Sequence, residues 1–124
     1  MADFDKQKAA DWLIKNAMPK YGVGKCATHV RLGLEAGGLN TTGHPDCAKD
    51  WGPTLIRKGF AVTDTRVAKL GDIVVFQMLD AKNAAGHIEY YDGKNWISDF
   101  IQDGFWPGHR WEKANIAHKT YRLP

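Results

Sequence analysis

The chain has only two cysteines, Cys26 and Cys47, among its 124 residues. Two cysteines are too few for the disulfide framework of a small secreted domain, so they form one bridge or none. The sequence also lacks an apolar run of the roughly 20 residues that cross a bilayer, and it begins without the basic and apolar regions of a signal peptide. We therefore expect no membrane insertion, and delivery by a route that does not use this segment.

A strong excess of one charge is missing as well. The 17 basic and 14 acidic residues are interspersed, which gives a net charge of +3 and a pI near 8.9. Nucleic-acid binding needs a clustered basic stripe, so we expect no nucleic-acid partner, whereas a weakly cationic surface suits an anionic cell envelope. A chain of this length can bury one core but not two, which predicts a single domain over residues 1–124.

The first half of the chain has helical spacing of its apolar residues. Three helices are predicted there, each from residues three or four apart together with a start or stop signal. They cover residues 6–17 after the capping residue Asp5, residues 26–36 before Gly37 and Gly38, and residues 47–58 before Gly59, the last helix being kinked or split near Pro53.

The second half is instead rich in strand signals. Residues 72–76 form a short β-branched run, residues 87–91 and 95–100 flank an Asp92-Gly93 turn, and residues 117–123 could form a last strand. Helices followed by antiparallel strands predict an α+β fold.

Cys26 opens the second predicted helix. The unpaired N–H groups and the dipole at a helix N-terminus favour the negative thiolate over the thiol, and Gly22 and Gly24 leave the approach to the sulfur open. A purely structural cysteine is the alternative, and position alone does not decide between them.

A nucleophilic cysteine needs a base, and the base needs a group that orients it. His87 is the best candidate of the five histidines, because it follows Gly86, begins a strand and precedes a hairpin that brings a carboxylate back toward it. His29 lies one turn along the same helix as Cys26 and leaves little room for a substrate. The other three, in a loop or in the less regular C-terminal part, are His44, His109 and His118.

The loop of the hairpin decides which residue faces His87. A loop of three or five residues sets Asp99 opposite His87, close enough for its carboxylate to accept a hydrogen bond from the imidazole. A two-residue turn would set Ser98 there instead. Glu89, on the same strand face as His87, is the fallback orienting residue.

These elements together resemble a known family. A cysteine that opens a helix, then KLGDIVVF, then GHIEYYDGKNWISDF is similar to the NlpC and CHAP group of papain-like cysteine peptidases, which cut amide bonds in the peptide stems of bacterial peptidoglycan. The resemblance covers about residues 21–100 and includes a polar residue twelve positions after the histidine. It implies a papain-like α+β fold, with Cys26 as nucleophile, His87 as base, Asp99 as orienting residue and no cofactor.

The resemblance also implies a biological setting. The small size without a wall-anchoring module is similar to amidase effectors of type VI secretion systems or to compact phage lysin domains, which act in the bacterial envelope. An effector of that kind would have an immunity protein that plugs the groove between Cys26 and His87. The residues CATHV match the motif of neither subgroup, so the bond that is cut stays open.

Several alternatives remain at this stage. Tyr21 is predicted either to donate to the substrate oxyanion or to pack on the first helix, and Trp106 is predicted to lie near a groove. Cys47 is a structural thiol, a bridge partner of Cys26 or a second nucleophile. A zinc site built on Cys47 and His44 lacks a second pair of ligands, so we predict no metal site. The competing functions are a non-catalytic wall-binding module and a protein-directed cysteine protease or deamidase toxin.

Overall fold

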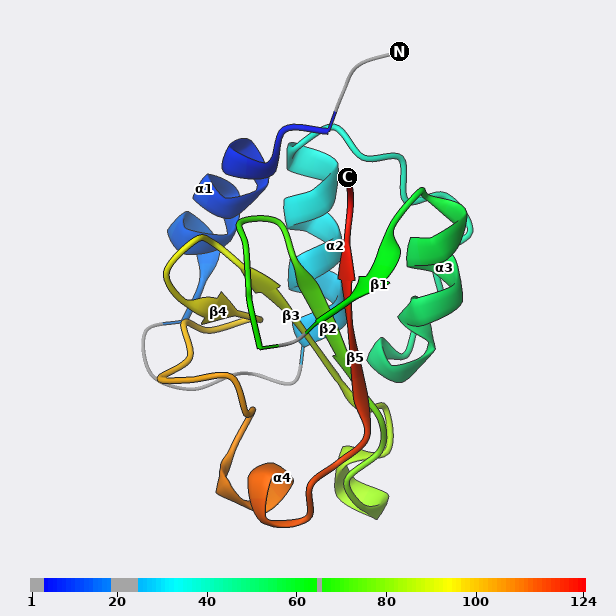
Figure 1. Cartoon of the computed structure of the whole chain (residues 1–124), viewed down its shortest axis with the longest axis vertical. Coiled ribbons are helices and arrows are strands. Elements are labelled where there is room, and N and C mark those ends of the chain that lie inside the picture. The colour runs from blue at the N-terminus through cyan, green and yellow to red at the C-terminus, as the bar shows by residue number, and fades with distance from the viewer. Residues whose placement is uncertain (1–3, 19–24, 65) are drawn as a thin grey trace.

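The computed structural model describes residues 4–18, 25–64 and 66–124. Figure 1 shows helices in the first half of the chain and a sheet formed mainly by the second half. The helices are α1 (Lys6–Asn16), α2 (Cys26–Ala36), α3 (Trp51–Arg57) and α4 (His109–Lys113), with short 3-10 turns η1 (Ala48–Asp50) and η2 (Ala81–Asn83). The strands are β1 (Ala61–Thr63), β2 (Ile73–Phe76), β3 (His87–Tyr91), β4 (Trp96–Ile97) and β5 (His118–Arg122).

The five strands form one antiparallel sheet in the order β1-β5-β2-β3-β4. The predicted α+β class is therefore confirmed. All four residues of β2 are buried, because this central strand is covered on both faces: Ile73 and Val75 belong to one apolar cluster, and Val74 and Phe76 belong to another. A continuous apolar run is what a strand buried on both faces requires.

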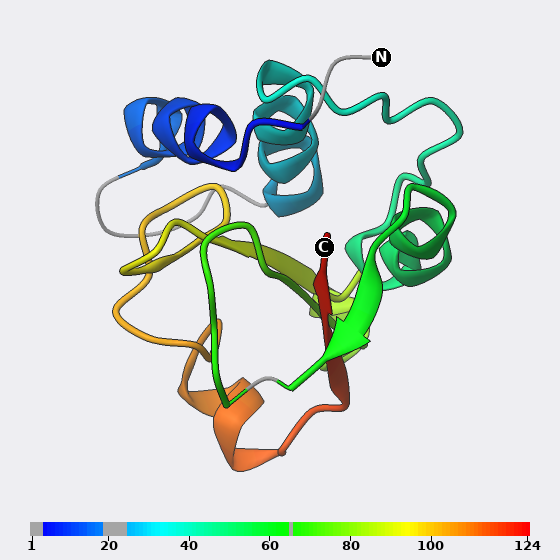
Figure 2. The same ribbon diagram turned by 45° about the horizontal axis from the view of Figure 1, so that its top comes forward.

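The helices lie on opposite sides of this sheet. Figure 2 shows α1 and α2 together on one side and α4 on the other. Asp5 caps α1 by accepting a hydrogen bond from Lys8 N at 2.9 Å, as predicted. Gly33 lets α1 approach α2 closely, since a Cβ at this position would lie 2.6 Å from Leu13 Cγ. Among the described residues, no helix has both the length and the apolar character needed to span a bilayer.

Other element predictions need correction. The third helix is split before Trp51 rather than at Pro53, because Pro53 lies in the first turn of α3, where a missing N–H costs no helical hydrogen bond. The strand predicted over residues 95–100 shortens to β4, since the chain folds back after Ser98, whose N–H donates to Phe100 O at 3.0 Å. Neither β1 nor α4 is predicted, and both are too short for a periodic signal.

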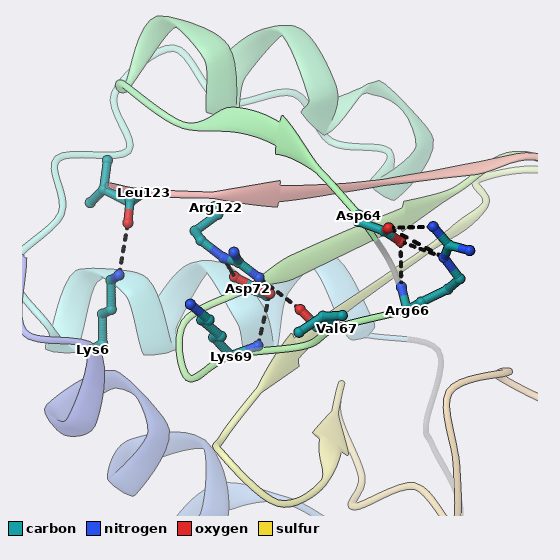
Figure 3. Close-up of polar contacts among 8 residues, drawn as sticks. All are labelled: Lys6, Asp64, Arg66, Val67, Lys69, Asp72, Arg122 and Leu123. Carbon is teal, nitrogen blue, oxygen red and sulfur yellow. Dashed lines mark hydrogen bonds and ion pairs between the residues drawn. The ribbon is translucent and has the colours of Figure 1, made fainter.

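The C-terminal strand is held by charged contacts as well as by the sheet ladder (Figure 3). Arg122 Nε and one terminal nitrogen donate to the two carboxylate oxygens of buried Asp72 at 2.8 and 2.7 Å. The same guanidinium donates to Val67 O, and Lys6 Nζ donates to Leu123 O. These contacts join the end of β5 to the residue before β2 and to the first helix.

Candidate active site

Cys26 is the first residue of α2 and follows the N-cap residue Lys25. The predicted start of a helix at this cysteine is therefore confirmed. Its side chain is partly buried and lines the same cavity as the imidazole of His87, the first residue of β3, and its interaction with this imidazole raises the pKa of His87. The fold thus brings together a thiol and an imidazole that are 61 residues apart in the sequence.

His87 is placed by the glycine before it. Gly86 has a φ of +74°, and a Cβ there would lie 2.3 Å from Phe76 O and 2.7 Å from Lys49 Cβ. The rings of Phe76 and Trp111 flank the imidazole, with ring centroids 6.1 and 5.9 Å from its own. Backbone crowding on one side and aromatic rings on the other therefore fix where the imidazole lies.

Two buried polar side chains lie at the Nε2 atom of His87. Gln102 Oε1 is 2.9 Å and Glu89 Oε2 is 3.2 Å from this nitrogen. Glu89 is fully buried and Gln102 nearly so, and Gln102 Nε2 donates to Glu89 Oε2 at 2.9 Å. The carboxylate beside the imidazole is therefore that of Glu89, which the sequence gives as the fallback orienting residue.

The predicted register of the hairpin is wrong. Tyr91 pairs with Trp96, so neither a three- nor a five-residue loop sets Asp99 opposite His87, and the two-residue Asp92-Gly93 turn does not form either. The side chain of Asp92 accepts hydrogen bonds from Lys94 N and Asn95 N, which stabilises a loop over residues 92–95 and shifts the strand pairing by one residue from the predicted one.

Asp99 nevertheless lies close to the candidate nucleophile. Its Oδ2 accepts a hydrogen bond from Lys25 N at 3.0 Å, directly before α2, and Ser98 Oγ donates to its Oδ1 at 3.3 Å. Asp99 also lines the same cavity as Cys26 and His87. The structure therefore brings all three predicted catalytic residues to one site, with Asp99 at the helix N-terminus.

A cavity of about 310 Å³ opens over the Cys26–His87 pair. Trp111 and Pro107 line it, whereas Trp106 is not among the described lining residues and packs on Phe76 and Phe105. Tyr21 lies outside the described residues. The residues of the cavity wall are Cys26, Lys82, Asn83, Ala85, Gly86, His87, Asp99, Phe100, Pro107 and Trp111.

Opposing effects set the charge of His87. Burial lowers the pKa of the imidazole, but hydrogen bonds to Cys26 and Glu89 and the negative charges of these groups outweigh burial and raise the pKa to about 10. Burial raises the pKa of Glu89 in turn, against the lowering effect of His87 and Gln102. The surroundings of His87 therefore favour the imidazolium form over the neutral imidazole.

The remaining candidate residues do not join this site. His29 packs edge-on to Trp12, and His44 stacks on Trp51. Both cysteines are free, so Cys26 and Cys47 form no bridge in this structure. Within residues 4–18, 25–64 and 66–124, no group of three or more His, Cys, Asp or Glu side chains is arranged to hold a metal ion.

Sequence reasoning missed Gln102 altogether. This residue follows β4 in a segment without regular secondary structure, so neither helical nor strand periodicity relates it to His87. No signal in the sequence marks it as a contact of the imidazole.

The chain is similar to proteins of known structure. No family model and no curated protein matches the chain. A chain in the crystal structure of the native type VI effector–immunity complex Tae3–Tai3 from Ralstonia pickettii matches with a TM-score of 0.88 and 38% identity, over 98% of this chain and 100% of that one. The chain belongs to the Tae3 family.

The selenomethionine form of the same complex supports this assignment. It matches with a TM-score of 0.84 and 39% identity, over 93% of this chain and 99% of the other. Because the similarity to Tae3 runs through nearly the whole chain, it includes both α2, which carries Cys26, and β3, which carries His87.

Proposed function

We propose that this Tae3-family protein is a cysteine amidase of papain-like fold that hydrolyses an amide bond in the peptide stems of bacterial peptidoglycan. Residues 1–124 act as one catalytic domain. The observation that carries the proposal is that Cys26, at the N-terminus of α2, and His87 line one open cavity. The similarity to an effector from an effector–immunity complex supports it, as does the sequence resemblance to peptidoglycan-cutting cysteine peptidases.

The reaction follows from the chemistry of the pair. The thiolate of Cys26 attacks the amide carbonyl carbon, and first-turn N–H groups of α2, including that of Cys26, stabilise the oxyanion that forms. His87 donates a proton to the amine nitrogen as the C–N bond breaks, leaving an acyl group on the sulfur. His87 then takes a proton from water, whose oxygen attacks the thioester and releases the acid and Cys26.

The neighbouring carboxylates take different roles. Glu89 accepts from Nε2 and stabilises the imidazolium, which is the orienting role that the sequence assigns first to Asp99. Asp99 accepts from Lys25 N and holds the start of α2, so it acts on the nucleophile side of the cavity. Both residues are buried.

The proposed partners are those of a type VI effector, namely its substrate and an immunity protein. A type VI effector acts in the periplasm of a target cell, where the substrate is the peptidoglycan stem, and needs no membrane insertion. An immunity protein would protect the producing cell by covering the cavity between Cys26 and His87. The matched structures are effector–immunity complexes, which supports such a partner.

Digestion of purified peptidoglycan tests the proposal. Wild-type protein is expected to release new amine and carboxyl ends, detected by mass analysis of the soluble muropeptides, whereas Cys26→Ala is expected to release none above background. Cys47→Ala is the matched control, because Cys47 is also free and partly buried but lies outside the described cavity wall. Equal behaviour of wild type and Cys26→Ala would contradict the proposal and favour a wall-binding module.

A further inference from the structure

The side chain of Gln102 connects the imidazole of His87 to three other groups. Its Oε1 lies 2.9 Å from His87 Nε2, while its Nε2 donates to Glu89 Oε2 at 2.9 Å, to Gly104 O at 3.0 Å and to Trp106 O at 3.4 Å. The residue is only 4% exposed. A buried amide with these contacts has one orientation, and that orientation determines which nitrogen of the imidazole carries a proton.

The three partners on one side of the amide decide this orientation. Glu89 Oε2 and the two backbone carbonyls accept hydrogen bonds, so the NH₂ group of Gln102 must face them. The amide oxygen is then directed at His87, where it can only accept. A hydrogen bond between Gln102 and His87 therefore requires that Nε2 of the imidazole carries a proton.

We propose that Gln102 is a positioning residue for the amidase reaction: it keeps the proton on His87 Nε2, so that Nδ1 is the nitrogen that exchanges a proton with Cys26 and with the substrate amine. This inference deepens the proposed function and rests on it. The thiol proton moves to Nδ1, the same proton later passes to the leaving amine, and the proton on Nε2 stays in place throughout. Gln102 is not among the described residues of the cavity wall.

Glu89 alone would hold the imidazole less firmly. Its Oε2 is farther from His87 Nε2, at 3.2 Å, than Gln102 Oε1 is, and this same oxygen accepts from Gln102. Gln102 therefore fixes both the imidazole and the carboxylate. The other ionisable residues that line the cavity with Cys26 and His87 are Asp99 and Lys82.

Alkylation of Cys26 by iodoacetamide tests this role without peptidoglycan. In a Cys47→Ala background, Gln102→Leu removes an acceptor of the imidazolium, so the thiolate–imidazolium pair should form less readily. The alkylation rate at pH 7 is expected to fall about tenfold, which is the worth of one hydrogen bond to a charged group, and the rate-against-pH profile should move to higher pH. The matched control is Gln7→Leu, since Gln7 is exposed on α1 and donates only to Asp11.

A double-mutant cycle separates positioning from a general loss of structure. If Gln102 and Glu89 act as one unit on Nε2, the alkylation rate of Glu89→Gln/Gln102→Leu should fall by less than the product of the two single losses. Independent losses that multiply, or a Gln102→Leu profile superimposable on that of the parent protein, would overturn the proposal. Thermal unfolding of each variant identifies any that fail to fold.

The wild-type protein provides a measurement that does not depend on a variant. Nitrogen-15 NMR of the His87 imidazole is expected to show a slowly exchanging proton on Nε2 across the neutral range. An imidazole that keeps its proton on Nδ1 and loses it from Nε2 would overturn the inference. Because alkylation and NMR use no substrate, absence of peptidoglycan hydrolysis would contradict the proposed function and leave these two results standing.

Discussion

At the scale of single residues, the surroundings of His87 determine how readily its imidazole becomes charged. Burial opposes the imidazolium, but the adjacent thiol and the Glu89 carboxylate stabilise it enough to raise its pKa to about 10. A histidine pKa raised above its unfolded value of about 6.5 contributes stability that is complete below that pH and is lost as pH rises toward the folded value. The buried Glu89 carboxyl, whose pKa is also raised, acts in the same direction.

This balance predicts a pH dependence of folding. The free energy of unfolding of the wild type should fall between about pH 6.5 and pH 10, and the fall should be smaller in Glu89→Gln, which removes one cause of the raised His87 pKa. Urea unfolding at pH 6, 8 and 10 measures both slopes. Asp99→Asn is the comparison variant, because Asp99 Oδ2 accepts a hydrogen bond from Lys25 N at the start of α2; a slope changed more by Asp99→Asn would assign the orienting role to Asp99.

The sequence predicts single functional residues where a local signal exists. Cys26 stands out because it opens a helix, and His87 because it follows a glycine and begins a strand. The choice between Asp99 and Glu89 depends on the register of the hairpin. The hydrogen bonds of the Asp92 side chain shift the strand pairing by one residue, and propensities alone do not predict this shift. Gln102 reaches His87 only through the fold of an irregular segment.

At the scale of elements, the packing of the helices on the sheet brings the start of β3 against the start of α2. Gly86 is the residue on which this depends most directly, because β3 begins one position later and the backbone there leaves no room for a side chain. The elements predicted correctly, among them α1, α2 and β2, have long periodic or continuous apolar patterns. The elements missed, β1 and α4, are three and five residues long, and tertiary contacts rather than local sequence determine them.

Replacing Gly86 by alanine should therefore harm both folding and activity. The new Cβ would overlap Phe76 O, and alanine would also have to adopt the positive φ of Gly86. We therefore expect a loss of more than about 3 kcal/mol of unfolding free energy and loss of peptidoglycan hydrolysis. Gly43→Ala is the matched control, since Gly43 has a φ of +87° with nothing within 4 Å of an added Cβ, and should cost about 1 kcal/mol. Chemical denaturation compares the two, and equal losses would contradict the steric explanation.

At the scale of the whole molecule, the candidate active site lies where two apolar clusters meet. Cys26 packs against the cluster under α1 and α2, whereas Phe76 and Trp111, which flank His87, belong to the cluster on the other face of the sheet. The cavity over the Cys26–His87 pair is therefore open only if the sheet holds both clusters in place. The C-terminal strand β5 is central to this, because it pairs with both β1 and β2.

The ion pair between Asp72 and Arg122 should accordingly stabilise the molecule as a whole. Asp72 is fully buried and accepts from Arg122 and from Lys69 N. Because Arg122 is partly exposed and water can replace some of the lost contacts, Asp72→Ala is expected to cost about 2 kcal/mol. The matched control is Asp64→Ala, which breaks the exposed pair with Arg66 and should change stability little. Thermal unfolding followed by circular dichroism ranks the two variants. Asp72 precedes β2, whereas His87 pairs with Phe76 at the other end of this strand. Cys26 in the folded fraction of Asp72→Ala should therefore react with iodoacetamide with the wild-type pH profile; a shifted profile would mean that this ion pair also positions the site.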